Sequence, residues 1–372
     1  MLTILHLTHK SNMAGGGEKS MIELALEQQK SGLMVSVVCS DGEIESLLER
    51  NGISFRSCPA FSKISSLSFE KKWNALGKFL DIINSAWRLS SIIKSIKSDV
   101  LHFHTILSLF CAVPYLIFNG SKQKVVYHHR SPTSIRRIKF IMCFVDSIVL
   151  ISKKEFNVAR NLNLSARLYH IPNAVNAAIV GDGNVSNEDI VRVAIPAAIK
   201  PLKRQEDAVD FVKFFAERYA GEKAIEFTIR GRSEDVEYLS MIQEKSKKYG
   251  LDHILSFVVG ELTTSELFDS VDIALFFSRT ETFGRVVAEA MSAGVAVISE
   301  ANDGAFEIID DGVNGFIINR DFNRLYEILI HLLIDKSALK KIKTAGQQTW
   351  NNRFQVSILA RRIETVYRET EE

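Results

Sequence analysis

The chain has 372 residues, of which 46% are hydrophobic and 24% are charged. These values are typical of a globular protein with about two domains of roughly 150 residues each, and they exclude a disordered chain. The formal net charge is only +2, and we expect no nucleic-acid partner.

Cysteine spacing and hydropathy indicate the cellular compartment of the protein. The four cysteines are scattered without any CxxC spacing, so we expect reduced thiols and no metal site. The amino terminus lacks a basic segment followed by an apolar core, which predicts no signal peptide. The apolar run at 106–118 is interrupted by Ser108 and Pro114 and is too short to span a membrane. We therefore expect a cytoplasmic protein.

The small net charge hides an asymmetry between the two halves of the chain. Residues 1–176 carry a net charge of +10, and the remainder carries −8. A basic half beside an acidic half favours two domains with different partners. Anionic lipid headgroups or a phosphate-bearing acceptor would suit the basic half. Ordinary scatter of surface charge is the other interpretation.

The chain opens with a predicted strand, turn and helix. Leu2–Leu7 is apolar and predicts the strand, and NMAGGG at 12–17 is the turn. An amphipathic pattern predicts a helix over Glu18–Lys30, which Gly32 ends before a second strand at Val35–Cys39. This order predicts a βαβ unit. The glycine run alone does not match GxGxxG and is equally typical of a flexible loop.

Basic and apolar residues alternate from Phe61 to Lys97. From Lys71 onward the pattern predicts an amphipathic helix that carries Trp73 and Trp87. Such a helix can lie on an anionic membrane surface. It can equally pack its apolar face inside the domain, and the sequence leaves both interpretations open.

Two further predicted strands, DVLHFH at 99–104 and KVVYHHR at 124–130, end in histidines. These are His102, His104, His128 and His129. Because the carboxyl ends of parallel strands meet at one edge of a sheet, we expect the four histidines near that edge. No acidic partner or HExxH pattern accompanies them, so we predict no metal. The loop that follows either meets an acidic or phosphorylated acceptor or is solvated; its cations are Arg130, Arg136, Arg137 and Lys139.

Small and polar residues at 177–189 predict a linker to a second domain. Val191–Ile199 is the first predicted strand of that domain, and the turn KPLKRQ at 200–205 leads into a helix over Glu206–Tyr219. Later predicted strands end at Gly231 and at Gly260.

The stretch at 278–307 organises the second half. An apolar strand at Val271–Phe277 is followed by a polar turn with Glu281 and by a helix with Glu289. Eight residues of helix rise about 12 Å, so two carboxylates at this spacing can hold hydroxyls at the two ends of one ligand. The other interpretation is that Glu281 caps the helix electrostatically and Glu289 is a surface charge.

These segments resemble the retaining glycosyltransferases of family 4. ETFGRVVAEAMSAGVAVISE, which contains Glu281 and Glu289, is similar to the family's Glu-x7-Glu donor motif. NDGAFEIIDDGVNGFII resembles the family's next segment through Gly304, Glu307, Gly312 and Gly315. GGGEKSMIELALEQQKSG and YHIPNAVN resemble two family segments of the first half.

The resemblance implies an α/β chain with the GT-B fold, in which two Rossmann-like domains with parallel sheets face each other across a cleft. We expect an acceptor-binding domain at 1–176, a linker at 177–189 and a donor-binding domain at 190–352. The last helix, at 353–372, is expected to pack back on the first domain.

The resemblance also implies site residues. As catalytic residues, Glu281 is expected to orient the sugar, His129 to contact it near the reacting carbon, and Lys203 to neutralise the leaving diphosphate. The expected donor-binding residues are Gly16, Gly17, Lys203, Arg204, Gly231, Arg232, Glu281, Thr282, Phe283, Gly284 and Glu289. The acceptor-side candidates are His104, His128, Arg130, Arg136 and Arg137, and His128 is also the second choice for the role of His129.

One position departs from the family pattern. Ala198, or Ile199 if the register shifts by one residue, stands where the family carries a phosphate-binding arginine. Either Lys200 or Arg204 supplies the missing charge, or donor binding is weakened.

The predicted function is retaining transfer of a hexose from a nucleotide-diphosphate sugar to a hydroxyl of a glycan or lipid-linked acceptor, in bacterial surface polysaccharide or lipopolysaccharide synthesis. No cofactor or metal is expected, and contact with the inner face of the cytoplasmic membrane would be peripheral. Two alternatives are a nucleotide-sugar 2-epimerase of the same fold and a non-catalytic nucleotide-sugar-binding homologue. The first needs no acceptor surface, and the loss of the arginine supports the second.

Overall fold

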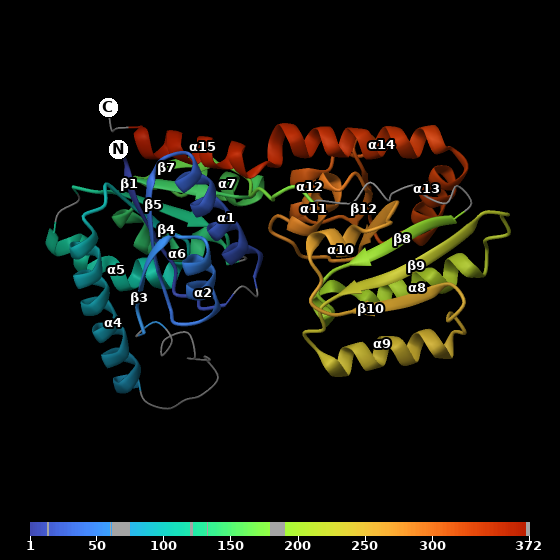
Figure 1. Cartoon of the computed structure of the whole chain (residues 1–372), viewed down its shortest axis with the longest axis horizontal. Coiled ribbons are helices and arrows are strands. Elements are labelled where there is room, and N and C mark those ends of the chain that lie inside the picture. The colour runs from blue at the N-terminus through green and yellow to red at the C-terminus, as the bar shows by residue number, and fades with distance from the viewer. Residues whose placement is uncertain are drawn as a thin grey trace. The chain divides into compact units, whose positions relative to one another are not determined.

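The computed structural model describes residues 1–12, 15–59, 61, 75–119, 122–131, 133–178 and 190–369. The chain divides into two compact units, one made of Met1–Asn173 with Val356–Glu372 and the other of Ala174–Gln355 (Figure 1). Each unit contains one parallel sheet with helices packed against it, so the predicted α/β class is confirmed. Most of the predicted linker, at 179–189, lies outside the described residues.

The first unit is built on a seven-stranded sheet in the order β3-β2-β1-β4-β5-β6-β7. Its strands are β1 (Thr3–Leu7), β2 (Met34–Cys39), β3 (Ser54–Ser57), β4 (Val100–Phe103), β5 (Lys124–His129), β6 (Ser147–Leu150) and β7 (Arg167–His170). The winding reverses between β1 and β4, which pair in parallel with His6 opposite His102. The carboxyl ends of these two strands therefore form the switch point of the sheet, where α/β proteins usually bind ligands.

Helices cover the first sheet. They are α1 (Gly16–Lys30), α2 (Glu43–Arg50), α4 (Ala75–Ile96), α5 (Ile106–Asn119), α6 (Ile135–Ile138), the 3-10 helix η1 (Lys139–Phe144), α7 (Lys153–Arg160) and α15 (Val356–Arg368). The last helix, α15, belongs to the first unit although it ends the chain (Figure 1). It packs on α1, where the side-chain amide nitrogen of Gln28 donates to the Tyr367 hydroxyl at 3.2 Å. The expected return of the last helix to the first domain is confirmed.

Burial explains why these segments form strands. Every residue of β4 and β6 is buried, as expected for a parallel sheet covered on both faces. Tyr127, Phe61 and Phe103 are among the largest side chains of the first core. The predicted amphipathic helix is α4, but residues 62–74 of that stretch, with Trp73, lie outside the described residues.

The apolar run at 106–118 forms helix α5, which continues through Pro114. Across the described part of the chain, no helix combines the length and the apolar character that a membrane crossing requires.

The second unit has a six-stranded sheet in the order β10-β9-β8-β11-β12-β13. Its strands are β8 (Ile190–Pro196), β9 (Ala224–Gly231), β10 (Leu255–Val259), β11 (Ile273–Phe276), β12 (Ala296–Glu300) and β13 (Phe316–Ile318). The winding reverses between β8 and β11, which pair in parallel. The second switch point therefore lies at the carboxyl ends of these two strands.

The helices of the second unit follow the strands in alternation. They are η2 (Pro201–Lys203), α8 (Gln205–Ala216), α9 (Val236–Lys248), α10 (Thr264–Phe268), α11 (Arg285–Ser292), α12 (Asp303–Ile308), α13 (Phe322–Ile334), α14 (Lys336–Thr349) and the π-helical turn η3 (Trp350–Phe354). Thr263 and Glu266 form a capping box at the start of helix α10. Helix α11 begins only at Arg285 because Gly284 is left-handed, with φ of 78°.

Candidate functional site

The second switch point brings together Lys203 and Glu281. Lys203 ends the short helix η2 after β8, and Glu281 lies in the loop after β11. The Lys203 ammonium and the Glu281 carboxylate form an ion pair. Their side chains are 18% and 24% exposed, so a ligand at this edge can reach both groups. Glu281 is not on the helix, and the expected rise of about 12 Å between Glu281 and Glu289 therefore does not apply.

Gly304 lets the loop that carries Glu281 pack against helix α12. Its backbone N–H donates to the Glu281 carbonyl at 2.9 Å. A Cβ atom at Gly304 would lie 2.6 Å from the Phe283 carbonyl oxygen and 3.0 Å from the Glu281 Cβ. The structure thus gives a steric reason for this glycine of the second motif block.

We expect Gly304→Ala to lower the free energy of unfolding by about 1–3 kcal/mol, because the added methyl group overpacks the loop. Gly260→Ala is the matched control, since a Cβ atom there meets nothing within 4 Å; its effect should stay within about 0.5 kcal/mol. Urea unfolding of both variants measures this. Equal stability of the two would show that the close approach at Gly304 is unimportant.

Glu289 is buried rather than a solvated surface charge. It is 9% exposed, and its carboxylate pairs with the Arg285 guanidinium at 3.2 Å, one helical turn earlier. Arg285 also donates to the Ala174 carbonyl at 3.0 Å. A helix i,i+4 spacing could have revealed this partner, but the sequence interpretation did not consider it.

Phe283 and Gly284 contribute backbone rather than side chains. The Phe283 ring is 3% exposed and packs edge-on against Phe354. Thr282 is half-buried beside them. The backbone N–H groups at the start of α11 are what this turn can offer to an anion.

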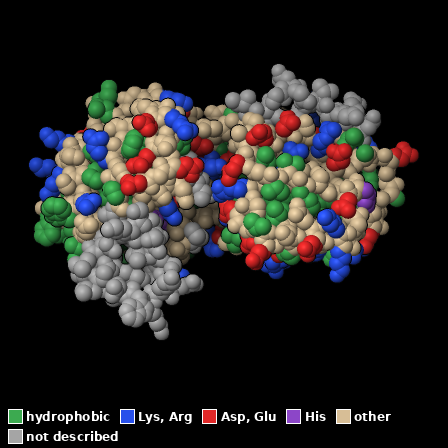
Figure 2. Space-filling model, turned by 60° about the horizontal axis from the view of Figure 1, so that its bottom comes forward, with side chains coloured by type: hydrophobic (Ala, Val, Ile, Leu, Met, Phe, Trp, Pro, Cys, Tyr) green, Lys and Arg blue, Asp and Glu red, His purple; other side chains and the backbone are tan. Residues whose placement is uncertain are grey.

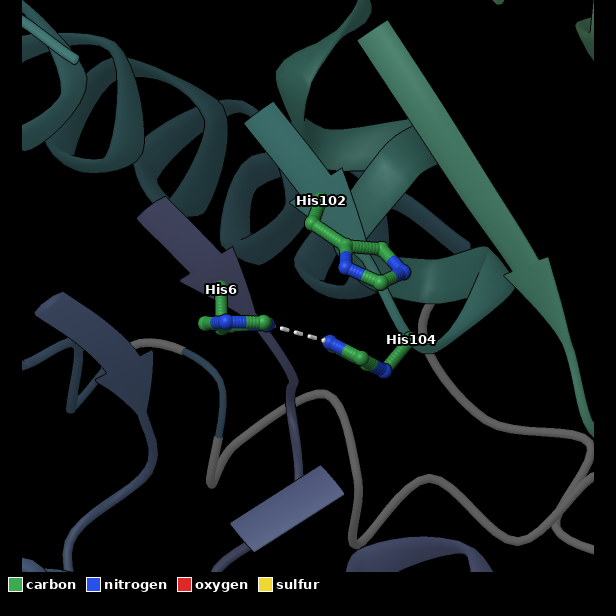
Figure 3. A group of neighbouring side chains, drawn as sticks. All are labelled: His6, His102 and His104. Atoms are coloured by element: carbon green, nitrogen blue, oxygen red, sulfur yellow. Dashed lines mark hydrogen bonds between the residues drawn. The ribbon is translucent and has the colours of Figure 1, made fainter. Parts of the chain in front are cut away.

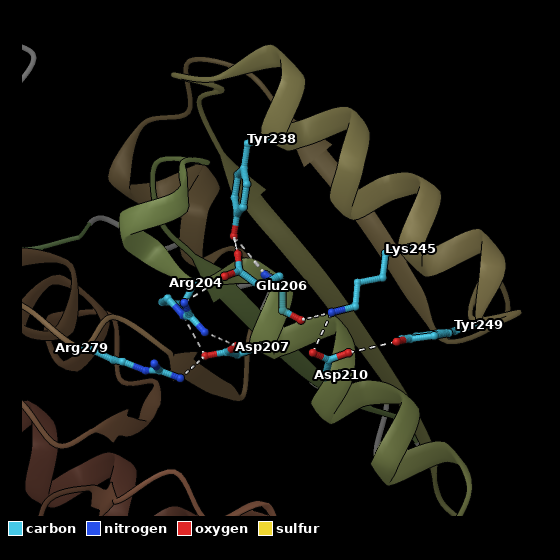
Figure 4. Close-up of polar contacts among 8 residues, drawn as sticks. All are labelled: Arg204, Glu206, Asp207, Asp210, Tyr238, Lys245, Tyr249 and Arg279. Atoms are coloured by element: carbon cyan, nitrogen blue, oxygen red, sulfur yellow. Dashed lines mark hydrogen bonds and ion pairs between the residues drawn. The ribbon is translucent and has the colours of Figure 1, made fainter.

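Arg204 does not point freely into the site. Its guanidinium donates to the Asp207 carboxylate at 3.0 and 2.7 Å and pairs with Glu206 at 3.2 Å. Asp207 also binds Arg279 at 3.0 Å (Figure 4). The Arg204 side chain is 32% exposed, so its place in the donor site stays a prediction.

The other cations near Ala198 are also paired with carboxylates. Lys200 pairs with Glu234 at 2.6 Å, and Glu234 also pairs with Arg232 at 2.5 Å. Gly231 precedes Arg232 with φ of +145°, and a Cβ atom there would lie 2.1 Å from the Ala197 carbonyl oxygen. The turn is thus tight, and its cations are balanced by acidic partners.

A cavity of about 340 Å³ lies elsewhere in the second unit. Ile190, Asp272 and Gly294 line it, and these residues start β8 or precede β11 and β12. It therefore lies at the amino ends of the strands, opposite to the edge that binds ligands in α/β sheets. We do not assign the donor site to it.

The first switch point carries a cluster of buried histidines. Figure 3 shows His6 from β1 beside His102 from β4 and His104, which directly follows β4. The Nδ1 of His6 and the Nε2 of His104 share a hydrogen bond of 2.8 Å. His128 stacks on His102 with ring centroids 5.4 Å apart. Sequence reasoning missed His6, because it lies alone in an apolar strand and only the register with β4 reveals its place.

Arg130 lies at the edge of this cluster. Its guanidinium contacts the Nδ1 of His104 and donates to the Asn173 side-chain oxygen at 3.1 Å. A Cβ atom at Gly17 would lie 3.9 Å from the Arg130 side chain, which places the glycine turn of α1 beside Arg130. Arg136 and Arg137 are exposed on α6.

His129 faces away from the other histidines, because side chains alternate along β5. Its Nδ1 lies 3.3 Å from the Tyr127 hydroxyl, and its Nε2 lies 3.9 Å from the Glu155 carboxylate. The ring is 1% exposed. His129 thus ends β5 at the expected edge of the sheet, but its ring lies on the opposite face from His102, His104 and His128.

A metal could in principle use three of these rings. His6, His102 and His104 offer nitrogen atoms within 4.8 Å of one another. However, hydrogen bonds engage both nitrogens of His6 and of His104, and the Arg130 cation lies against the cluster. Within the residues that the structure describes, this chemistry disfavours a bound cation.

Burial sets the protonation of the cluster. It lowers the pKa of His6 to about 4 and lowers the pKa values of His102, His104 and His128 well below the ordinary value. All four rings are therefore neutral at pH 7 in the folded chain.

We expect the first unit to lose stability as the pH falls below 6.5. The folded pKa values lie below the unfolded value, so the unfolded chain binds more protons there, whereas stability is fully present above pH 6.5. Each buried histidine contributes a loss of about 1.4 kcal/mol per pH unit. Urea unfolding at pH 7 and pH 5 measures the slope. His128→Phe should make it shallower, whereas the exposed control His253→Gln should not; equal slopes would contradict the assignment.

The fold and the two switch-point clusters define a class of protein: a two-unit α/β enzyme with a candidate ligand site on each sheet, as in glycosyltransferases of the GT-B fold. The family comparison supports this class over nearly the whole chain. The model described as "Glycosyl transferases group 1" matches residues 179–349, and the model "Glycosyltransferase Family 4" matches residues 14–178. The chain belongs to the family-4-like GT-B glycosyltransferases.

Solved structures with the same fold include the Anabaena protein Alr3699/HepE in complex with UDP. It has a TM-score of 0.79 and 17% identity over 98% of this chain and 99% of that chain. The lipopolysaccharide outer core galactosyltransferase WaaB has a TM-score of 0.71 and 17% identity over 99% of both chains. At these identities the likeness shows the fold.

Curated relatives match over shorter segments. The alpha-1,3/1,6-mannosyltransferase ALG2 of Dictyostelium discoideum is 28% identical over 144 residues, which are 37% of this chain and 34% of that protein. The capsular polysaccharide biosynthesis glycosyltransferase CapM of Staphylococcus aureus is 29% identical over 101 residues, 27% of each chain. The matched segments thus span about a third or less of these two relatives.

Proposed function

We propose that this glycosyltransferase transfers a hexose from a nucleotide-diphosphate sugar to a hydroxyl acceptor, with retention of the anomeric configuration. The observation that carries the proposal is the ion pair at the second switch point between Lys203 and Glu281, the first glutamate of the Glu-x7-Glu segment. A cation and a carboxylate side by side match the two ends of the reacting group, a diphosphate and a sugar with paired hydroxyls.

Each residue then has a role in the donor site. Lys203 and the backbone N–H groups at the start of α11 stabilise the charge on the leaving diphosphate, without a divalent metal. Glu281 orients the sugar through its hydroxyls. Glu289, held by Arg285, accepts hydrogen bonds from the ribose. Gly231 and Arg232 flank the nucleotide.

The acceptor would meet the first unit at its switch point. Arg130 presents a guanidinium there beside His104 and the glycine turn at Gly16 and Gly17. Guanidinium groups bind carboxylates and phosphates through two parallel hydrogen bonds, which suits an acidic or phosphate-linked acceptor. The similar proteins include a capsular polysaccharide biosynthesis glycosyltransferase and a lipopolysaccharide outer core galactosyltransferase, and these names support a glycan or lipid-linked acceptor.

A thermal-shift screen tests the donor half of the proposal. The full chain is heated with UDP, GDP, ADP, CDP and dTDP and with their common sugar conjugates. We expect one base to raise the unfolding temperature, and we expect Glu289→Ala to abolish that response. An unchanged response in Glu289→Ala would remove Glu289 from the site.

One observation favours a second candidate, a homologue that binds the nucleotide sugar without transferring it. Ala198 supplies no cation, and Lys200 and Arg232 are both engaged by Glu234. Binding of the selected nucleotide sugar without transfer to any acceptor in an extract would favour this candidate. An epimerised nucleotide sugar formed without acceptor would instead favour the 2-epimerase.

Peripheral membrane contact is a further part of the proposal. Trp87, Phe118 and Phe140 are 76%, 84% and 66% exposed, and Figure 2 shows hydrophobic side chains next to Lys and Arg on the surface of the first unit. Tryptophan beside basic residues suits an anionic lipid interface.

We expect the chain to sediment with vesicles that contain phosphatidylglycerol and not with pure phosphatidylcholine vesicles. Trp87→Ser should reduce the bound fraction several-fold, because it removes an aromatic anchor. Val313→Ser, at a 60% exposed apolar position of the second unit, is the control. Equal sedimentation of both variants and the unchanged chain would exclude α4 from lipid contact.

A further inference from the structure

A single file of hydrogen bonds runs through the interior of the first unit and links Arg130 to the C-terminal helix. Its members, in order, are Arg130, His104, His6, Gln28, Tyr367 and His102. His6, Gln28 and His102 have no exposed surface, and Tyr367 is 4% exposed. Water therefore has little access to replace a broken link.

The chemistry of Arg130 sets the direction of the whole file. A guanidinium can only donate, so the Nδ1 of His104 must accept, and the neutral ring carries its proton on Nε2. That proton is donated to the Nδ1 of His6 at 2.8 Å. His6 must then carry its own proton on Nε2.

The same logic continues to the C-terminal helix. The Nε2–H of His6 donates to the Gln28 side-chain oxygen at 2.8 Å, which fixes the orientation of the amide. The amide nitrogen donates to the Tyr367 hydroxyl at 3.2 Å, and that hydroxyl donates to the Nδ1 of His102 at 2.5 Å. Reversing the file would place two donors face to face at Arg130, so the reversed tautomers require the guanidinium to move away from His104.

We infer that Gln28 and Tyr367 are positioning residues that hold the Arg130 guanidinium in place by fixing the tautomers of His6 and His104. Helix α15 thereby acts through Tyr367 on the Arg130 guanidinium, along the hydrogen bonds of the file. The inference rests on the proposed function only where it assigns the acceptor to Arg130. The lowered pKa values of His6 and His104 support it, because the file requires neutral rings.

A purely structural role of Tyr367 makes a different prediction. If Tyr367 only packs α15 against α1, its loss changes stability and leaves the tautomer of His104 unaltered. The tautomer of a ring several links away is therefore the signature of the file.

Long-range proton–nitrogen correlation NMR on the full chain, labelled with ¹⁵N-histidine, reads these tautomers without any substrate. In the unchanged chain we expect His6, His102 and His104 to carry their protons on Nε2. Gln28→Met keeps the length of the side chain but removes both of its hydrogen bonds. We expect at least half of His104 to move its proton to Nδ1 in this variant.

Tyr367→Phe is the second variant, because it keeps the ring that packs α15. We expect a smaller shift of His104 in the same direction. Tyr326→Phe is the control, because the Tyr326 hydroxyl donates to the Arg218 carbonyl in the second unit. This variant should leave the tautomer of His104 unchanged. A His104 proton on Nδ1 in the unchanged chain, or no shift in either variant, would overturn the inference.

The position of Arg130 is read separately by phenylglyoxal labelling and mass spectrometry, with the exposed Arg136 as internal reference. We expect phenylglyoxal to label Arg130 at least threefold faster in Gln28→Met than in the unchanged chain. In a sugar-transfer assay kcat should fall at least fivefold with KM for the nucleotide sugar unchanged, because the donor residues lie in the second unit. A tautomer shift without loss of transfer would overturn the positioning role, whereas absence of donor binding in the unchanged chain would sink the proposed function alone.

Discussion

Replacing Lys203 by methionine is expected to weaken binding of the selected nucleoside diphosphate about 100-fold, or by about 3 kcal/mol. The loss has two physical sources. The diphosphate loses a charge-assisted hydrogen bond from the ammonium. The Glu281 carboxylate, which pairs with Lys203, is left uncompensated and repels the incoming anion.

Calorimetric titration of the nucleoside diphosphate measures the loss. Lys247→Met is the matched control, because Lys247 is an exposed lysine of α9 in the same unit, and its affinity should stay within about twofold. If Lys203→Met bound as tightly as Lys247→Met, the diphosphate would lie elsewhere in the protein.

Replacing Glu281 by glutamine should change binding and catalysis in opposite directions. Glu281 neutralises Lys203 in the free chain, so the amide releases the ammonium to the phosphates. We expect the affinity for the free nucleoside diphosphate to rise about fivefold. This change corresponds to roughly 1 kcal/mol, the free energy that a partly exposed ion pair contributes. Sugar transfer should fall about 100-fold, because an amide grips the sugar hydroxyls less strongly in the transition state.

Nucleotide affinity and sugar transfer are measured together to test this prediction. Titration with the nucleoside diphosphate and a transfer assay with its sugar conjugate are run on the same preparation. Glu237→Gln, at an exposed position of α9, should alter neither quantity. A parallel fall in nucleotide affinity and transfer would show instead that Glu281 supports the loop and does not compete for Lys203.

The sequence predicted most of the architecture because parallel strands are continuous apolar runs. The strands at β4, β8 and β11 and the helix α15 lie within a few residues of their predicted positions. The sequence did not reveal that α11 begins only at Arg285, because the left-handed conformation of Gly284 cannot be read from the residue types. Helices α2 and α9 were not predicted at all.

The candidate site was predictable only in part. Lys203 and Glu281 followed from motif segments, and the second sheet brings them into direct contact across 78 positions of sequence. The partners that hold the other groups did not follow from a motif. Arg204 turns to Asp207 because its own backbone is left-handed, with φ of 58°. Gln28 meets Tyr367 only because α15 returns to the first unit, 339 residues later.

The central claim is that the second switch point holds the donor between Lys203 and the start of α11. A crystal structure of the full chain with the selected nucleotide sugar tests it most directly. We predict the diphosphate within hydrogen-bond distance of the Lys203 Nζ, with the Lys203–Glu281 ion pair opened and the sugar hydroxyls on the Glu281 carboxylate. A nucleotide sugar bound elsewhere, with that ion pair intact, would contradict the account.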